Sequence, residues 1–424
     1  MKCYVLGLLL TVLGTSLAAS DPLMVGGSYS TTDNIKRIFK DRDGNFDKIR
    51  HPTTGAKARA DMLTFIQNKV EMLQLLAKQK GFHAANYTQQ FTTDIQVSYD
   101  HKTVNGTNVI LVLHGTANNT EDEPVMLLAN YDTARNTNAV NEGSGVVALL
   151  TLFESLVQDL PAKNFELKSS VIFAFTDVAH KKYDEETGTP RGETGAHKLG
   201  SEWLRIFMSD RKHFRGAVVL DNLLNYNSTG RSQLVQDTGI DKSFSTSYTK
   251  LAENAFSGDF VALVHRNDDM DNPLANAIEE AWNRSSHHHK DKTGGQQDSN
   301  STQLDAKLLR FTFNKNMFVS PSVNHFLNSE QSALWNEHAS IGQTQYPAIT
   351  LTDTRNLRAG CRQMCNVSAM LTDENLQFMA RTVKTLKHFI IQNQTVDSGA
   401  FSSLQSSVIF LVGSAIFAIY NGRY

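Results

Sequence analysis

Two long stretches of the chain repeat apolar residues at the spacing of an amphipathic helix. One spans residues 58–80 and is followed by Gly81, a common helix stop, and the other spans residues 373–392. Each stretch places its apolar residues on one face, and shorter helices are expected at residues 145–156 and 199–208. We predict that each of these helices packs its apolar face against the core.

Five short runs are almost wholly apolar and lack a helical period, which is typical of strands covered on both faces. Residues 91–99 instead alternate apolar and polar positions, as a half-buried strand does. Strands that alternate with helices predict a three-layer α/β/α domain with a mixed, mostly parallel central sheet over residues 30–395. The five apolar runs are residues 108–113, 125–129, 169–175, 216–220 and 348–351.

Polar residues stand at the ends of three of these runs. They are Asn130, Asp177 and Asp221. Because ligands in such folds bind outside the carboxyl ends of the strands, these positions mark the candidate site. Residues 283–302 are polar and low in complexity, so we expect a solvated insertion loop there, in which a run of three histidines is incidental.

The first 19 residues have the pattern of a secretory signal peptide. Lys2 supplies the charge, residues 5–17 the apolar core, and Ser16-Leu17-Ala18 a cleavage pattern with small residues at both ends. The apolar run is too short for a membrane helix and has no stop-transfer flank. We therefore expect the chain to enter the secretory pathway.

Residues 398–424 have the features of a membrane-anchor signal. The apolar run at residues 408–420 would rise about 20 Å as a helix, short of a hydrocarbon core of roughly 30 Å. A small triplet, Ser398-Gly399-Ala400, and a polar spacer precede it, as in a glycolipid-anchor signal. A tail helix that starts near Phe401 is the alternative. Either reading predicts a membrane as partner, with the domain in the lumen of the endoplasmic reticulum or at the cell surface.

Eight Asn-x-Ser/Thr sequons agree with a glycoprotein of the secretory pathway, and each would lie in an exposed loop if it is used. Cys361 and Cys365, the two cysteines outside the signal, can pair as a local disulfide in an oxidising compartment. Two buried thiols are the alternative, and a redox or zinc site would need further cysteines. The sequons begin at Asn86, Asn105, Asn118, Asn227, Asn283, Asn300, Asn366 and Asn393.

The formal net charge of −2 and the absence of a basic stripe argue against nucleic acid as a partner. Seven segments, in this order, make the chain resemble the zinc-dependent aminopeptidases, a family that includes glutaminyl cyclases and the non-catalytic ectodomains of the transferrin receptor, nicastrin and nicalin. The resemblance covers about residues 35–392. Its segments are ANYD at 129–132, NEGSGVVALL at 141–150, VIFAFTD at 171–177, KLGSEWL at 198–204, GAVVLDN at 216–222, SEQSALW at 329–335 and YPAITLTD at 346–353.

The resemblance implies a site for two zinc ions, held by imidazole and carboxylate ligands. Where the family has its first His this chain has Asn130, and where it has the bridging Asp this chain has Asn141. Asp221 matches the fourth ligand and is kept. Asp132 matches the residue that orients the first His. The loss of a His and a bridging carboxylate together predicts a vestigial site.

The remaining family positions also depart from the pattern. A Glu-Glu pair, of which one binds zinc and the other takes a proton from water, aligns with Ala179 and His180. The last His aligns with Gln363. The family's Gly-Ser-Gly turn is kept at residues 143–145, where packing explains it better than anion binding at the helix N-terminus. We therefore expect no catalytic residue and no metal cofactor.

An alternative reading restores part of the site. Glu185 and Glu186 could stand in for the Glu-Glu pair if the loop after the third strand carries an insertion, although a charged solvated loop is the simpler reading. An active zinc aminopeptidase or glutaminyl cyclase with rearranged ligands would then use these two residues, His180 and Asp221. His197, His325 or His338 would have to complete the set.

Three functions remain open after this reading. The first is a non-catalytic ectodomain that binds or holds a protein partner at a membrane. The second is the rearranged zinc enzyme, and the third is a structural surface glycoprotein whose glycans matter more than its site.

Overall fold

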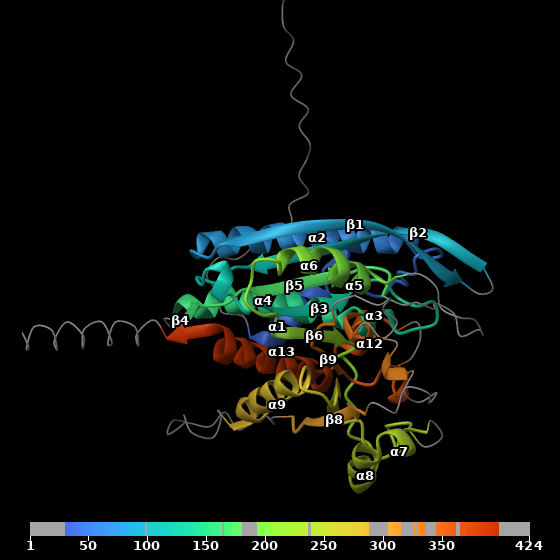
Figure 1. Ribbon diagram of the computed structural model, residues 1–424. Helices are drawn as coiled ribbons and strands as arrows, with labels where there is room; N and C mark the ends of the chain where they lie inside the picture. The colour runs from blue at the N-terminus through green and yellow to red at the C-terminus, as the bar shows by residue number, and fades with distance from the viewer. Residues whose placement is uncertain are drawn as a thin grey trace, which may run out of the picture.

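The computed structural model describes residues 30–97, 100–162, 165–179, 193–235, 239–287, 304–314, 325–327, 329–335, 345–361 and 365–397. Its centre is an eight-stranded sheet with the strand order β1-β2-β5-β3-β6-β9-β7-β8 (Figure 1). The four central strands β5, β3, β6 and β9 run parallel. β2 runs antiparallel to β1 and β5, whereas β7 runs antiparallel to β9 and parallel to β8. The strands are β1 Ala84–Val97, β2 Asp100–Leu113, β3 Val125–Asn130, β5 Val171–Thr176, β6 Gly216–Asp221, β7 Phe260–Arg266, β8 Lys307–Phe313 and β9 Ala348–Thr352.

Alternate residues of the central strands enter two different cores, as strands covered on both faces require. In β3, for example, Leu127 packs into one core and Leu128 into the other. On the first face lie α1 Thr31–Phe39, α2 Ala56–Gln79, α4 Ser144–Ala162, α9 Asn272–His287 and α13 Asp373–Gln394. The second face is covered by α5 Gly195–Lys198, the π-helix η3 Leu199–Leu204, α6 Arg205–Phe207, α7 Ile240–Ser243, α8 Ser245–Glu253 and α11 Gln331–Trp335. The predicted three-layer α/β/α domain with a mixed, mostly parallel sheet is confirmed.

Each predicted helix and strand has a counterpart in the structure, although several boundaries and one helix type differ. The strand expected at residues 108–113 is the last part of β2, which begins at Asp100. The strand expected at residues 91–99 begins earlier, at Ala84. The helix expected at residues 199–208 is a π-helix that runs on into α6. The loop expected to begin at residue 283 was placed too early, because α9 continues to His287 and buries Trp282 against the core.

α4 is the central helix of the fold. The segment Ala139–Leu160 is apolar and long enough to cross a membrane, but 94% of its most apolar window is buried inside the domain. A Cβ atom on Gly145 would lie 2.2 Å from the carbonyl oxygen of Leu220 and 2.9 Å from Cβ of Ala129. The glycine therefore lets the helix begin directly against β3 and β6, in agreement with the packing explanation for the Gly-Ser-Gly turn.

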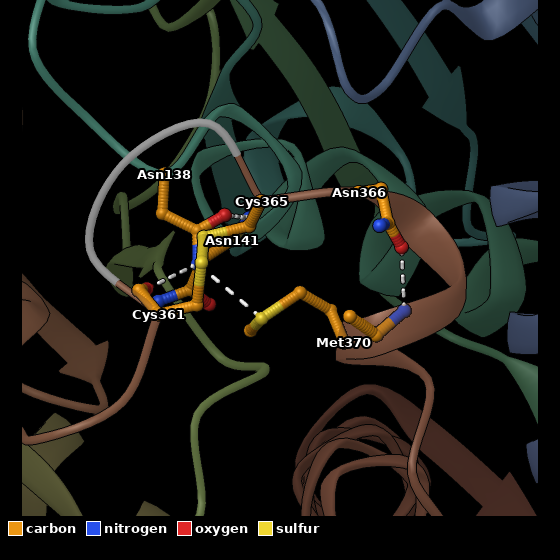
Figure 2. The surroundings of a disulfide bond; sticks show 7 residues. Asn138, Asn141, Cys361, Cys365, Asn366 and Met370 are labelled. Carbon is orange, nitrogen blue, oxygen red and sulfur yellow. Dashed lines mark hydrogen bonds between the residues drawn. A yellow bond between two sulfur atoms is a disulfide. The ribbon is translucent and has the colours of Figure 1, made fainter.

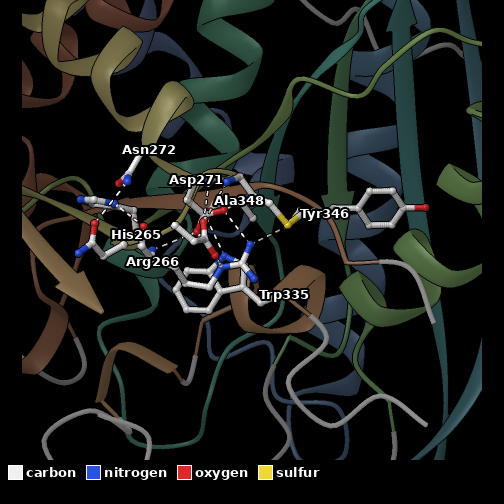
Figure 3. A network of polar contacts seen from close by, with 10 residues as sticks. His265, Arg266, Asp271, Asn272, Trp335, Tyr346 and Ala348 are labelled. Carbon is white, nitrogen blue, oxygen red and sulfur yellow. Dashed lines mark hydrogen bonds and ion pairs between the residues drawn. The ribbon is translucent and has the colours of Figure 1, made fainter. Parts of the chain in front are cut away.

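A buried ion pair closes the edge of the sheet at which the parallel strands begin (Figure 3). Arg266, at the end of β7, donates from Nε and Nη2 to both carboxylate oxygens of Asp271, at 3.0 and 2.9 Å. Asp271 also accepts from the backbone nitrogen of Ala348 at 3.0 Å, and Trp335 donates to the carbonyl of that residue at 2.8 Å. These bonds connect β7, β9 and α11, and they leave the opposite edge for the candidate site.

Candidate functional site

The carboxyl ends of β5, β3, β6 and β9 meet at one edge of the sheet because these strands are parallel. The backbone directly after three of them is strained. Val178, Asn222, Thr354 and Arg355 all have positive φ angles, of 52°, 56°, 73° and 53°. Residues other than glycine rarely adopt this conformation, and such residues cluster at functional sites. The strain therefore marks the same edge that the sequence predicts.

Asp221, which the sequence analysis aligned with a zinc ligand, forms an ion pair with Arg355. Nε of Arg355 lies 2.7 Å from Oδ2 of Asp221, and Nη2 contacts the same oxygen. Oδ1 of Asp221 accepts from the side-chain amide of Asn222 at 2.5 Å. Both oxygens of this carboxylate thus have donors from the chain itself.

Asn141 bonds to two other strand ends. Its Nδ2 donates to Oδ2 of Asp353 at 2.8 Å, and its Oδ1 accepts from the backbone nitrogen of Leu224 at 2.8 Å. Oδ2 of Asp353 accepts from the backbone nitrogen of Asn225 at 2.9 Å, and Oδ1 accepts from that of Arg355 at 2.8 Å. Burial raises the pKa of Asp353 to about 7, despite the opposing effects of Arg358 and the Asn141 amide. The amide is therefore a neutral bridge between α3 Ala139–Glu142 and the loops after β6 and β9.

Asn130 and Asp132 shape the loop that follows β3. Asn130 donates to the backbone carbonyl of Asp132 at 3.0 Å. Asp132 is fully buried and accepts from the backbone nitrogen of Ala179 at 3.0 Å. In this chain the carboxylate that the family uses to orient a histidine holds the loop after β5.

Two further acids at this edge have raised pKa values. Burial raises the pKa of Asp177 to about 6, because it outweighs the effect of Arg59, whose Nη1 lies 3.5 Å from Oδ1. Glu330 is also buried, and burial raises its pKa well above the usual value although Thr176 donates to it. Its Oε2 has no hydrogen-bond partner among the described residues. Burial therefore favours the protonated form of Glu330.

The histidines proposed as replacement ligands lie in different places. Nε2 of His325 is 3.2 Å from the carbonyl of Thr354, and burial lowers the pKa of this histidine to about 4. His197 caps α5, with Nδ1 2.7 Å from Oγ1 of Thr194. The other predicted site residues lie outside the described part of the chain; these are His180, Glu185, Glu186, His338 and Gln363.

The described residues do not fit a pair of zinc ions. Among them, no group of three or more His, Cys, Asp or Glu side chains is arranged to hold a metal. Asp221 is engaged by a guanidinium and Asn141 can offer a metal only a neutral oxygen, which here accepts from Leu224. The donors described at this edge therefore bond within the chain and do not form a set of metal ligands.

The predicted disulfide between Cys361 and Cys365 is confirmed, and it lies beside α3 (Figure 2). Asn138 donates from Nδ2 to the carbonyl of Cys361 at 2.8 Å, and to Sδ of Met370 at 3.4 Å. Its Oδ1 accepts from the backbone nitrogen of Asn141 at 3.1 Å. One asparagine thus connects the disulfide to the helix that carries the bridging amide.

Seven of the eight sequons lie on described residues, and Asn300 lies outside them. Asn227 and Asn393 are half-buried. Asn227 donates to the carbonyl of Ala359 at 3.4 Å, and Asn393 to that of Phe389 at 2.8 Å. The other five are exposed, as attachment of a glycan requires. Of these, Asn118 and Asn366 lie outside strands and helices, whereas Asn86 and Asn105 lie in β1 and β2 and Asn283 lies in α9.

Neither models of known protein families nor curated proteins match this sequence. Its solved structural neighbours are aminopeptidases and glutaminyl cyclases. A leucine aminopeptidase precursor from Bacteroides thetaiotaomicron has a TM-score of 0.49 and 11% identity, over 87% of this chain and 99% of that chain. A glutaminyl cyclase of the same organism, bound to N-acetylhistamine, has a TM-score of 0.45 and 10% identity, over 86% and 97%. A glutaminyl cyclase from Macrostomum lignano has a TM-score of 0.48 and 12% identity, over 85% and 88%. Nothing about activity follows from similarities at this level.

Three residues that shape this edge were not identified as site residues from the sequence. Asp353 and Arg355 follow β9 directly, so their position after a buried strand was the available signal. Arg50 is fully buried and donates to the carbonyls of Tyr131 at 2.6 Å and Ala139 at 2.9 Å, so it holds the loop between β3 and α3. Nothing in its local sequence distinguishes Arg50 from a surface arginine.

Proposed function

We propose that this chain is a membrane-anchored glycoprotein of the secretory pathway, whose aminopeptidase-like domain has no peptidase chemistry and binds or holds a protein partner. One observation supports the absence of peptidase activity. The carboxylate of Asp221, which the family uses for zinc, is bonded to Arg355 and Asn222. A metal would have to displace a guanidinium from a buried ion pair, and breaking such a pair costs about 3–5 kcal/mol.

The hydrogen bonds that order the site edge support a binding role for the domain without peptidase chemistry. Acids and amides at the site edge bond within the chain, as they do in Asn141–Asp353 and Asp132–Ala179. Function is carried by sites and not by folds, so an aminopeptidase-like domain can serve a partner without hydrolysis. The signal peptide, the sequons and the C-terminal apolar run support display at a membrane.

The test begins with metal content and activity of the full chain. The protein is expressed through the secretory pathway, extracted in detergent and purified without chelator, and zinc per chain is measured by mass spectrometry. We expect well under one equivalent of zinc and no hydrolysis of aminoacyl substrates or cyclisation of N-terminal glutamine. Stoichiometric zinc that is lost in Asp221→Ala would overturn the proposal in favour of a rearranged enzyme that uses Glu185 and Glu186.

The membrane attachment is tested separately on intact cells. Release by a phospholipase specific for phosphatidylinositol supports a glycolipid anchor, whereas retention supports a tail helix. Recovery of the protein in the soluble fraction without treatment would refute both. A shift in electrophoretic mobility after removal of N-glycans tests the sequons.

A further inference from the structure

The guanidinium of Arg355 lies beside the carboxylate of Asp221, which favours a positive charge at this position. The guanidinium contacts Oδ2 of Asp221 through two nitrogens, and the side chains of the two residues are 18% and 6% exposed. Burial alone would lower the pKa of Arg355, but Asp221, Glu142 and Asp353 together raise it. The ion pair with Asp221 thus stabilises the positive charge of Arg355.

The chain holds this guanidinium in place at a cost in backbone strain. Thr354 and Arg355 are consecutive residues with positive φ, a strained conformation for residues other than glycine. Neighbouring groups fix it: the backbone nitrogen of Arg355 donates to Asp353 at 2.8 Å, and Gln233 donates to Oγ1 of Thr354 at 2.9 Å. Strain persists only where the surroundings over-determine it, so the direction of the Arg355 side chain is set by the fold.

We propose that Arg355 is the built-in cation of this site, and that its guanidinium occupies a cation-binding position formed by the carboxylate of Asp221. This inference rests on the proposed absence of metal chemistry and deepens it, because it names what replaces the metal charge. The positive charge beside Asp221 comes from the chain itself, because Arg355 extends to it from the loop after β9. Removal of the side chain should leave a position that accepts a free guanidinium ion.

The experiment compares Arg355→Ala with Arg37→Ala in the full chain. Arg37 also pairs with a buried acid, Glu154 at 2.9 Å, but its side chain is 40% exposed. We expect Arg355→Ala to lower the melting temperature by more than about 5 °C, and Arg37→Ala by about 2 °C or less. Millimolar guanidinium chloride, compared with equal sodium chloride, should restore part of the loss in Arg355→Ala only.

Further variants keep the inference testable. In Arg355→Ala/Asp221→Asn the effect of guanidinium should disappear, because the carboxylate that binds it is gone. If Arg355→Ala does not fold, Arg355→Lys retains a cation and should fold with intermediate stability, whereas Arg355→Met, of similar length without charge, should not. An unchanged melting temperature in Arg355→Ala, or equal effects of guanidinium on both alanine variants, would overturn the inference. Zinc in the native protein would instead overturn the proposed function, so the two failures are distinguishable.

Discussion

The side-chain amide of Asn141 donates to the buried carboxylate of Asp353 at 2.8 Å, and this bond joins α3 to the end of β9. In Asn141→Asp two carboxylates would face each other in a buried place, where both cannot ionise without a large penalty. We predict that this substitution lowers the free energy of unfolding by about 2–4 kcal/mol at neutral pH, measured by urea denaturation.

The same chemical change at Asn272 is the control, because Asn272 is the first residue of α9 and an acid is favourable at a helix N-terminus. Asn272→Asp should leave the stability unchanged or slightly higher. Native stability in Asn141→Asp would contradict the prediction. If that stability depended on added zinc, it would show that a metal can bridge the two carboxylates.

Gly145 is predicted to tolerate no side chain. In Gly145→Ala the new methyl group would lie against the carbonyl of Leu220, which is fixed in the central sheet, so α4 must shift away from β6. We expect a loss of about 3 kcal/mol in the free energy of unfolding. Gly230→Ala is the matched control, since the nearest atom to its Cβ is 3.6 Å away and little change is expected. Similar stability of the two variants would contradict the close packing of α4.

The disulfide is predicted to stabilise the fold modestly, because the two cysteines are separated by only four positions. Loop-closure entropy for so short a ring gives about 2 kcal/mol, and the Cys361→Ala/Cys365→Ala variant should lose about that amount. Thermal unfolding of the native protein with a reducing agent should give the same shift, and the agent should not affect the double variant. A larger loss would mean that the link through Asn138 to α3 depends on the disulfide.

His114 should make stability fall at acidic pH. Its ring stacks on His83 with centroids 4.5 Å apart, and burial, then His83 and Arg211, lower its pKa from 6.5 to about 4. The unfolded chain therefore binds the proton more readily than the folded chain between these values, so stability is complete above pH 6.5 and decreases as pH falls towards 4.

Because the ring is partly exposed, we expect a contribution of only about 1–2 kcal/mol over this range. Urea unfolding at several pH values should show a shallower decrease in His114→Gln than in the native protein. His213→Gln, at an exposed histidine, serves as the control. Equal pH dependence in the native protein and His114→Gln would refute the prediction.

Much of the fold was predictable because its central strands are covered on both faces. Such strands are short apolar runs, and β3, β5, β6 and β9 have this composition. β7 and β8 were not predicted. β7 is buried and begins with the apolar run FVALV, so its composition was an available signal. β8 has the sequence KLLRFTF, which mixes charged and apolar residues. The π-helical turns in Leu199–Leu204 also could not be foreseen, since their apolar spacing resembles that of an α-helix.

The sequence by itself determined which chemical groups stand at the strand ends: amides at Asn130 and Asn141, and a carboxylate at Asp221. Only the tertiary structure decided what those groups bond to. Asp221 meets Arg355 across 134 positions of the chain, and Asn141 meets Asp353 across 212. Parallel strands bring their carboxyl ends to one edge whatever their distance in sequence, and the strained backbone after β9 then directs a guanidinium towards the carboxylate. Neither effect leaves a local pattern in the sequence, because both arise from the order of strands in the sheet.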